Sequence, residues 1–157
     1  MAGAVERFRL AAEARGLHLD IRTFPAGTKT AEAAARAVEC DVAQIVKSLV
    51  FVADGLPLLA LTSGANRADI ERLATLAGAS AVRRATPEEA REATGFGIGG
   101  TPPFGHPRPL RTFMDTDLMA YERLWAAAGG PDAVFPISPG ELLRASSAQV
   151  EEFKARS

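Results

Sequence analysis

The chain has 157 residues, of which 47% are hydrophobic and 24% charged, a composition typical of a globular domain and not of a disordered or fibrous chain. The 18 basic and 19 acidic side chains leave a formal net charge of -1, so any RNA contact must come from a local patch or from recognition of a chain end. The single cysteine excludes an internal disulfide and a cysteine-rich zinc site. We therefore expect one domain over residues 1–157, in the reducing cytoplasm.

The N-terminal segment has no signal-peptide pattern, because charges interrupt each of its apolar runs. No later stretch approaches the roughly 18 consecutive apolar residues that a membrane span needs. We expect no contact with a membrane.

The first forty residues predict a helix over residues 5–15 that stops at Gly16, then a strand over residues 18–24. A turn follows at residues 25–28. Thr30 is a good N-cap for a short alanine-rich helix over residues 31–38.

A β-hairpin is the clearest structural prediction in the sequence. Residues 45–53 are rich in β-branched and apolar side chains, residues 56–62 are the returning strand, and Asp54-Gly55 between them is a strong turn signal.

Later segments mix further helices and strands. We expect helices over residues 67–76, from Pro87 to Gly95, over residues 117–128 with Asp117 as the cap, and from Pro139, and strands over residues 80–84, 111–115, 133–137 and 149–153. A hairpin among such elements predicts an α/β fold in which a mixed sheet, curled and partly barrel-like, is flanked by helices.

Lys47 stands out because it lies in the middle of a strand that is apolar on both faces. Ile45, Leu49 and Phe51 share its face, whereas Val46 and Val50 share the opposite one. A buried ammonium is costly unless it is paired or used. The pattern leaves two interpretations, a lysine at the floor of a pocket or one that reaches solvent past the sheet edge.

A loop dense in glycine and proline occupies residues 96–109. Glycines allow close approach of the backbone to a ligand, and the N–H groups of Gly99, Gly100 and Thr101 could donate to a developing oxyanion. The alternative is an ordered loop without a ligand. His106, at the end of the loop, is either a general base or a structural residue.

Three motifs in this order resemble the YbaK/EbsC family, whose members are relatives of the editing domain of bacterial prolyl-tRNA synthetases. The motifs are Thr30-Ala-Glu-Ala-Ala, Ile45-Val-Lys-Ser-Leu-Val-Phe and Thr94-Gly-Phe-Gly-Ile-Gly-Gly-Thr-Pro-Pro-Phe-Gly-His. The resemblance implies a trans-editing deacylase that hydrolyses the ester of mischarged tRNA at its acceptor end. It implies Lys47 as the catalytic residue and no metal or organic cofactor.

The loop resembles most the ProXp subgroup, which implies a small or hydroxylated amino acid as the one removed. The chain departs from some relatives at residues 133–135, where they carry Asp or His, and at Ser48, where alanine-specific relatives carry asparagine. The substrate-binding residues that we predict are Thr30, Ser48, Ser63, Asn66, Gly99, Gly100, Thr101, Pro102, Pro103, Gly105 and His106.

Two other functions stay open from the sequence. The chain could be a non-catalytic module that binds the tRNA end or a synthetase, or it could hydrolyse a small ester unrelated to tRNA. The base that activates water also stays open between the substrate's own ribose hydroxyl or amine and His106.

Overall fold

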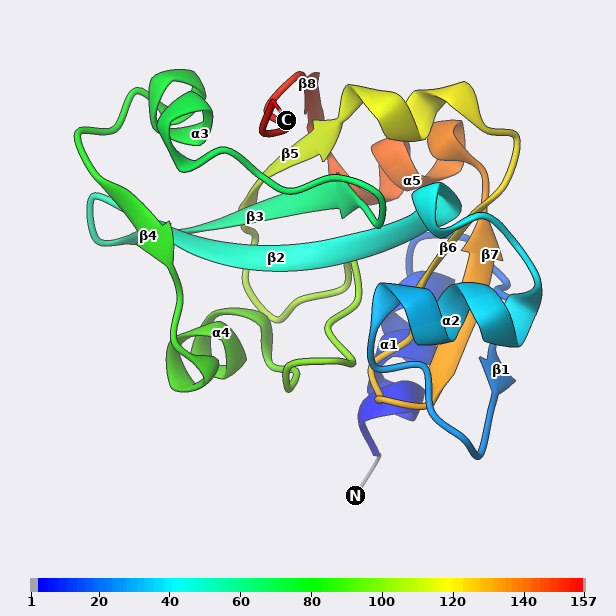
Figure 1. Cartoon of the computed structure of the whole chain (residues 1–157). Coiled ribbons are helices and arrows are strands. Elements are labelled where there is room, and N and C mark those ends of the chain that lie inside the picture. Colours follow the sequence, from blue (N-terminus) through cyan, green and yellow to red (C-terminus); the bar gives the residue numbers. More distant parts are fainter. Residues whose placement is uncertain (1–2, 157) are drawn as a thin grey trace.

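The computed structural model describes residues 3–156, so the ends of the expected domain, residues 1–2 and 157, lie outside the described residues. Eight strands form one mixed sheet in the order β1-β7-β6-β2-β3-β5-β8, with β4 paired to β2 (Figure 1). The sheet is open at both ends, so the expected mixed α/β fold is confirmed without closure into a barrel. None of the helices within residues 3–156 has the length and apolar character needed to cross a bilayer.

The strands are β1 (Arg22–Thr23), β2 (Ile45–Ala53), β3 (Leu56–Ser63), β4 (Val82–Arg84), β5 (Arg111–Asp115), β6 (Leu124–Ala127), β7 (Ala133–Ile137) and β8 (Gln149–Glu151). The helices are α1 (Ala4–Glu13), α2 (Ala31–Val38), α3 (Ile70–Ala77), α4 (Pro87–Thr94) and α5 (Pro139–Ser146), with short 3-10 turns η1 (Val42–Gln44) and η2 (Thr116–Ala120).

The predicted hairpin is confirmed, and it forms the centre of the sheet. Strands β2 and β3 pair antiparallel along their whole length, from Val46 opposite Ser63 to the turn. Asp54 and Gly55 both have positive φ, 48° and 84°, as a two-residue turn needs when its twist matches that of the strands.

The other edge of β2 is paired only at its two ends. Strand β6 runs parallel to it at Ile45 and Val46, and β4 runs antiparallel to it at Phe51–Ala53. The N–H of Ala85 donates to the carbonyl of Val50 at 3.0 Å, so the even-numbered residues turn their peptide groups toward this edge. The peptide of Ser48 therefore faces an interruption of the sheet between β6 and β4.

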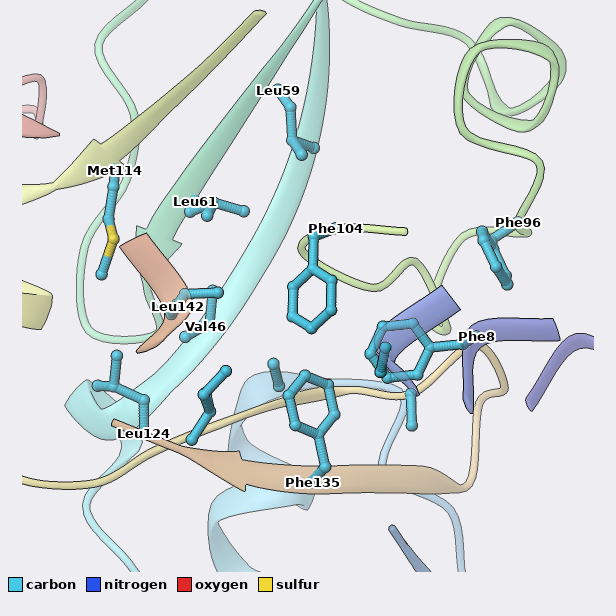
Figure 2. Close-up of a cluster of buried hydrophobic side chains, with 14 of the residues drawn as sticks. Phe8, Val46, Leu59, Leu61, Phe96, Phe104, Met114, Leu124, Phe135 and Leu142 are labelled. Carbon is cyan, nitrogen blue, oxygen red and sulfur yellow. The ribbon is translucent and has the colours of Figure 1, made fainter. Parts of the chain in front are cut away.

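Both faces of the sheet are covered, as the apolar pattern of β2 predicts. On one face Val46 and Val50 belong to a core that includes Phe8 of α1 and Leu142 of α5. The rings of Phe8, Phe104 and Phe135 lie 5.0–6.0 Å apart at its centre (Figure 2).

The opposite face is covered in two separate places. Ile45 packs under Ala34 and Ala35 of α2, and Phe51 packs with Leu73 of α3. Helix α2 thus lies over one end of β2 and α3 over the other, which leaves the side chain of Lys47 between two apolar clusters.

The predicted helix over residues 117–128 is wrong. Helical turns end at Ala120, and Leu124–Ala127 form β6, which pairs with β7 on one side and with β2 on the other. A short apolar run does not distinguish a buried strand from a buried helix by periodicity. Here the hydrogen bonds to β2 and β7 at both edges of the segment stabilise the strand.

Several other boundaries differ from the expectation: the helix expected over residues 5–15 ends at Glu13, and the strands expected over residues 80–84 and 149–153 cover only Val82–Arg84 and Gln149–Glu151. The expected helix at residues 67–76 begins at Ile70, because the carboxylate of Asp69 accepts from the N–H groups of the first turn. Asp115, and not Asp117, caps the turn after β5. The strand expected over residues 18–24 is reduced to Arg22–Thr23, which pair with β7.

Candidate active site

A pocket of about 340 Å³ opens at the interruption of the sheet beside β2. Its walls come from residues 45–50 of β2, the first turn of α2 and the residues before it, strands β6 and β7, the end of β4 with the start of α4, and the first part of the glycine loop. In Figure 1, α2 and β7 lie near the N-terminal end of β2, whereas β4 and α4 lie near its other end. Because the sheet lacks a strand here, backbone and side chains from both of its faces reach one cavity.

Lys47 lines this pocket and is half-buried. Its Nζ donates to the backbone carbonyl of Asn66 at 2.5 Å. Burial lowers the pKa of the Lys47 ammonium below its ordinary value, an effect that the negative charges of Glu32 and Asp115 oppose. The ammonium of Lys47 is thus a cationic hydrogen-bond donor, and its contact with the Asn66 carbonyl fixes its orientation.

Asn66 lies behind the lysine, outside the lining of the pocket. Its side-chain amide donates to the carboxylates of Asp115 and Asp117, both at 2.9 Å. Asp117 also accepts from the Nζ of Lys154 at 2.9 Å. The predicted site residue Asn66 thus contacts the predicted catalytic lysine through its backbone, and its side chain is engaged elsewhere.

Three residues of the glycine loop, Ile98, Gly99 and Thr101, line the pocket. The N–H of Gly100 donates to the carbonyl of Gly97 at 3.2 Å, so this group is already used within the loop. The N–H groups of Gly99 and Thr101 donate to no other residue in the range 3–156. Two of the three predicted oxyanion donors therefore stand at the cavity without a protein acceptor.

Gly100 holds the loop against the turn between β6 and β7. A Cβ at this position would lie 2.7 Å from the carbonyl carbon of Gly130 and 2.9 Å from that of Gly129. Only a glycine permits this approach of two backbones.

Thr30 and Ser48 also line the pocket, as predicted. The hydroxyl of Thr30 caps α2 by accepting from the N–H of Ala33 at 3.1 Å. The Oγ of Ser48 is buried and, among the described residues, has no hydrogen-bond partner. Such a group is costly to bury unless a ligand satisfies it.

The other predicted residues do not reach the pocket. Pro102 and Pro103 are buried, and Gly105 packs against Phe8 and Ala11. The Nε2 of His106 lies 2.9 Å from the carbonyl oxygen of Pro102, and burial lowers the pKa of its ring.

Ser63 also lies outside the pocket. Its hydroxyl donates to the carbonyl of Ala43 at 2.8 Å, which joins the end of β3 to the turn before β2.

Sequence reasoning missed several residues that line the pocket. Lys29, Glu32 and Arg84 bring charge to it, and Trp125 and Val134 bring apolar surface. Glu32 stands within the Thr30-Ala-Glu motif, and an acidic residue in the first turn of a helix needs no ligand to explain it. No group of metal-ligating side chains occurs among residues 3–156.

Comparisons with known proteins identify the family of this chain. The model of the aminoacyl-tRNA editing domain matches residues 25–145. A solved structure described as a candidate trans-editing enzyme for prolyl-tRNA synthetase is 47% identical, covers 99% of each chain and superposes with a TM-score of 0.93. The chain belongs to the aminoacyl-tRNA editing domain family.

Two curated relatives differ in how much of them the chain covers. The uncharacterised protein YwhH of Bacillus subtilis (strain 168) is 29% identical over 132 residues, which is 83% of each chain. The proline–tRNA ligase of Nitratidesulfovibrio vulgaris (strain DP4) is 36% identical over 92 residues, which is 59% of this chain and 16% of the ligase. The chain is thus similar to one segment of that larger enzyme.

Proposed function

We propose that this chain is a trans-editing deacylase that hydrolyses the ester between a small or hydroxylated amino acid and the acceptor end of a mischarged tRNA. The observation that carries the proposal is the half-buried amine of Lys47 in a cavity that Gly99 and Thr101 also line. Such an arrangement supplies donors for an oxyanion without reorganisation during the reaction. The cytoplasm, where translation occurs, is the compartment that fits this function.

The proposed reaction is a simple hydrolysis. The oxygen of a water molecule attacks the ester carbonyl carbon, and the carbonyl oxygen becomes an oxyanion that accepts hydrogen bonds from the Lys47 ammonium and the loop N–H groups. The bond from that carbon to the ribose oxygen then breaks, and the ribose oxygen takes the proton that the water has lost. The products are the free amino acid and tRNA with an intact acceptor end.

The base for this reaction is proposed to be the substrate's own ribose hydroxyl, because an amino group that is bound as ammonium has no lone pair to accept a proton. In support, His106 is outside the residues that line the pocket, and its ring nitrogen is engaged with Pro102. We expect His106→Gln to keep the hydrolysis rate within about threefold of the wild type, whereas loss of a general base typically costs about 10²–10⁴-fold. Single-turnover rates measured between pH 6 and 9 check this, and a loss of that larger size would make His106 the base.

Glu32 is proposed to bind the α-ammonium group of the amino acid. It is the one carboxylate among the described residues that line the pocket, beside the cationic Lys29, Lys47 and Arg84. Its carboxylate forms no ion pair or hydrogen bond with another residue in the range 3–156. An aminoacyl ester carries one cationic group, and a free carboxylate near the reacting carbonyl is the partner that such a group requires.

We expect Glu32→Gln to lower kcat/KM for mischarged tRNA about tenfold, since a charge-assisted hydrogen bond contributes about 1.5–3 kcal/mol and the exposure of Glu32 places this one at the lower end. N-acetylation of the aminoacyl group should lower kcat/KM of the wild type by a similar factor. It should lower kcat/KM of Glu32→Gln only slightly further. The matched control is Glu39→Gln, at the exposed C-terminal end of the same helix. Equal losses in both enzymes upon acetylation would contradict the role of Glu32.

The amino acid removed is proposed to be small because the cavity is small and Trp125 and Val134 bring apolar surface to it. A volume of about 340 Å³ is at the lower end of the range for ligand pockets. Val134, within the segment where some relatives carry a polar residue, lines the pocket. Editing of such amino acids is needed because one methylene gives a synthetase only about 1–3 kcal/mol of discrimination.

The test is a panel of tRNAs, first of all tRNA specific for proline, charged with alanine, serine, threonine, 2-aminobutyrate or proline. We expect release of one or two of the small amino acids and retention of proline. If the protein binds these tRNAs and releases no amino acid, it is a binding module. If it hydrolyses a simple aminoacyl ester equally fast, tRNA is not its substrate.

A further inference from the structure

We propose that Asn66 and Asp115 are positioning residues that hold the amine of Lys47 in place for catalysis. This inference rests on the proposed function, because it assigns a role to residues that act through Lys47. Neither side chain lines the pocket, so neither is proposed to touch the substrate.

The first link is the short hydrogen bond from Lys47 Nζ to the carbonyl of Asn66. An ammonium has three N–H donors and no acceptor. One of the three is directed to a fixed backbone oxygen, and this leaves two for a ligand. The position of the Asn66 carbonyl therefore sets the direction in which the remaining donors point.

The second link fixes that carbonyl. The N–H of Asn66 donates to the carbonyl of Ser63 at 2.9 Å, and its side-chain amide donates one hydrogen to Asp115 and one to Asp117. Both hydrogens of the amide are thus used on carboxylates, which are strong acceptors. The residue cannot rotate without breaking two charge-assisted hydrogen bonds.

Asp115 is the centre of this arrangement, at the end of β5 and 1% exposed. Its Oδ2 accepts from the N–H of Ser63 at 3.0 Å as well as from Asn66, and its Oδ1 accepts from the N–H of Asp117 at 3.0 Å. A buried carboxylate is tolerated when such donors satisfy it. One side chain thereby joins the end of β3, the loop that follows it and the turn after β5.

The C-terminal segment holds the same loop from outside. The N–H of Asp69 donates to the carbonyl of Phe153 at 2.8 Å, and the N–H of Ala155 donates to the carbonyl of Arg67 at 2.7 Å. Between them, the Nζ of Lys154 pairs with Asp117. The loop that carries the Asn66 carbonyl is therefore bound on two sides.

Charged groups from every neighbouring element act on the amine of Lys47. Glu32 of α2 and Asp115 of β5 raise its pKa, whereas Arg84 of β4 and Arg67 of the loop lower it. Asp115 is the one member of this set that also takes part in the hydrogen bonds described above, so its removal changes both the position and the charge environment of the amine.

The first experiment measures hydrolysis of mischarged tRNA by Asn66→Ala and Asp115→Asn. Asn66→Ala keeps the backbone carbonyl but removes the amide that holds it. We expect kcat to fall about 10- to 100-fold with KM nearly unchanged, as for a displacement of a catalytic group by about 1 Å. Asp69→Asn is the matched control, since Asp69 caps α3 in the same segment without contact to Asn66 or Asp115, and it should retain the wild-type kcat.

The second measurement follows Lys47 itself. The chain has three lysines, Lys29, Lys47 and Lys154, so protein labelled with ¹³C at the lysine ε-carbon gives three signals, each assignable by substitution. Asp115→Asn removes a negative charge that favours the charged amine, and Asn66→Ala releases the carbonyl that accepts from it, so in both variants we expect Lys47 to titrate at a lower pH than in the wild type.

Asn66→Ala decides the outcome if Asp115→Asn does not fold. An unchanged kcat, or a lower kcat with an unchanged titration of Lys47, would overturn the positioning role. The titration needs no substrate, so it tests the positioning role even if the wild type proves inactive on every tRNA, a result that would refute the proposed function alone.

Discussion

Replacing Lys47 with alanine is expected to lower the single-turnover rate of ester hydrolysis about 10²–10³-fold, as removal of one oxyanion donor typically does. Lys47 is half-buried, its amine donates to the carbonyl of Asn66, and it lines the same pocket as Gly99 and Thr101. The fold should persist, because the substitution removes a charge whose burial is costly as well as one hydrogen bond. Rapid-quench deacylation at saturating enzyme, with urea unfolding as the check on the fold, measures both.

The pH dependence adds a second signature of Lys47. Because the ammonium is the active form and burial lowers its pKa, the wild-type rate should fall as the pH rises through a value below 10.5. This alkaline decline should be absent from the residual activity of Lys47→Ala. Lys47→Arg keeps the charge but carries a wider, planar group, and should recover little of the rate. A Lys47→Ala rate within threefold of the wild type would contradict the proposed chemistry.

Gly100→Ala is expected to damage both stability and activity, although the residue does not line the pocket. The added Cβ would meet the backbone of Gly129 and Gly130 at 2.7–2.9 Å, and neither segment has a flexible side chain that could yield. Such overpacking costs about 1–3 kcal/mol of unfolding free energy. The loop should move away from β6 and β7 and carry Gly99 and Thr101 with it, so we expect the hydrolysis rate to fall about 100-fold.

Gly97→Ala is the matched control in the same loop. Its Cβ would lie 3.3 Å from the guanidinium of Arg91, the far end of an exposed side chain. This variant should keep the wild-type unfolding free energy and rate. If Gly100→Ala behaved in the same way, the close approach of the two backbones would have no importance for the site.

The elements that local sequence determines were predicted well. The hairpin, α2 and the capped start of α4 follow from turn and cap residues, and the structure confirms each one. The position of Lys47 between two apolar faces also follows from the alternation of one strand. These features depend on residues close together in the chain, where propensity and periodicity are informative.

The features that depend on distant segments were not predicted. Leu124–Ala127 form a strand because β2 and β7 lie on either side of them. The pocket exists because β6 and β4 leave the middle of one edge of β2 unpaired. No local pattern shows where a sheet is interrupted, so the pocket-lining positions of Glu32 and Arg84 could not be foreseen.

The environment of Asn66 shows the same limit of local patterns. Its place between the predicted strand over residues 56–62 and the predicted helix over residues 67–76 follows from the sequence, but its amide donates to carboxylates that lie 49 and 51 positions further along the chain. A buried aspartate at the end of an apolar strand was the only available signal, and Asp115 fits a helix cap equally well.

The most direct test of the central claim is binding of an inert substrate mimic to protein with ¹³C-labelled lysines. The mimic is adenosine that carries serine or alanine through an amide in place of the ester at the 3′ position. We predict that the signal of Lys47 shifts until the site is saturated, while that of Lys154, on the far side of Asp117, stays in place. Saturable binding that leaves the Lys47 signal unmoved would contradict the account.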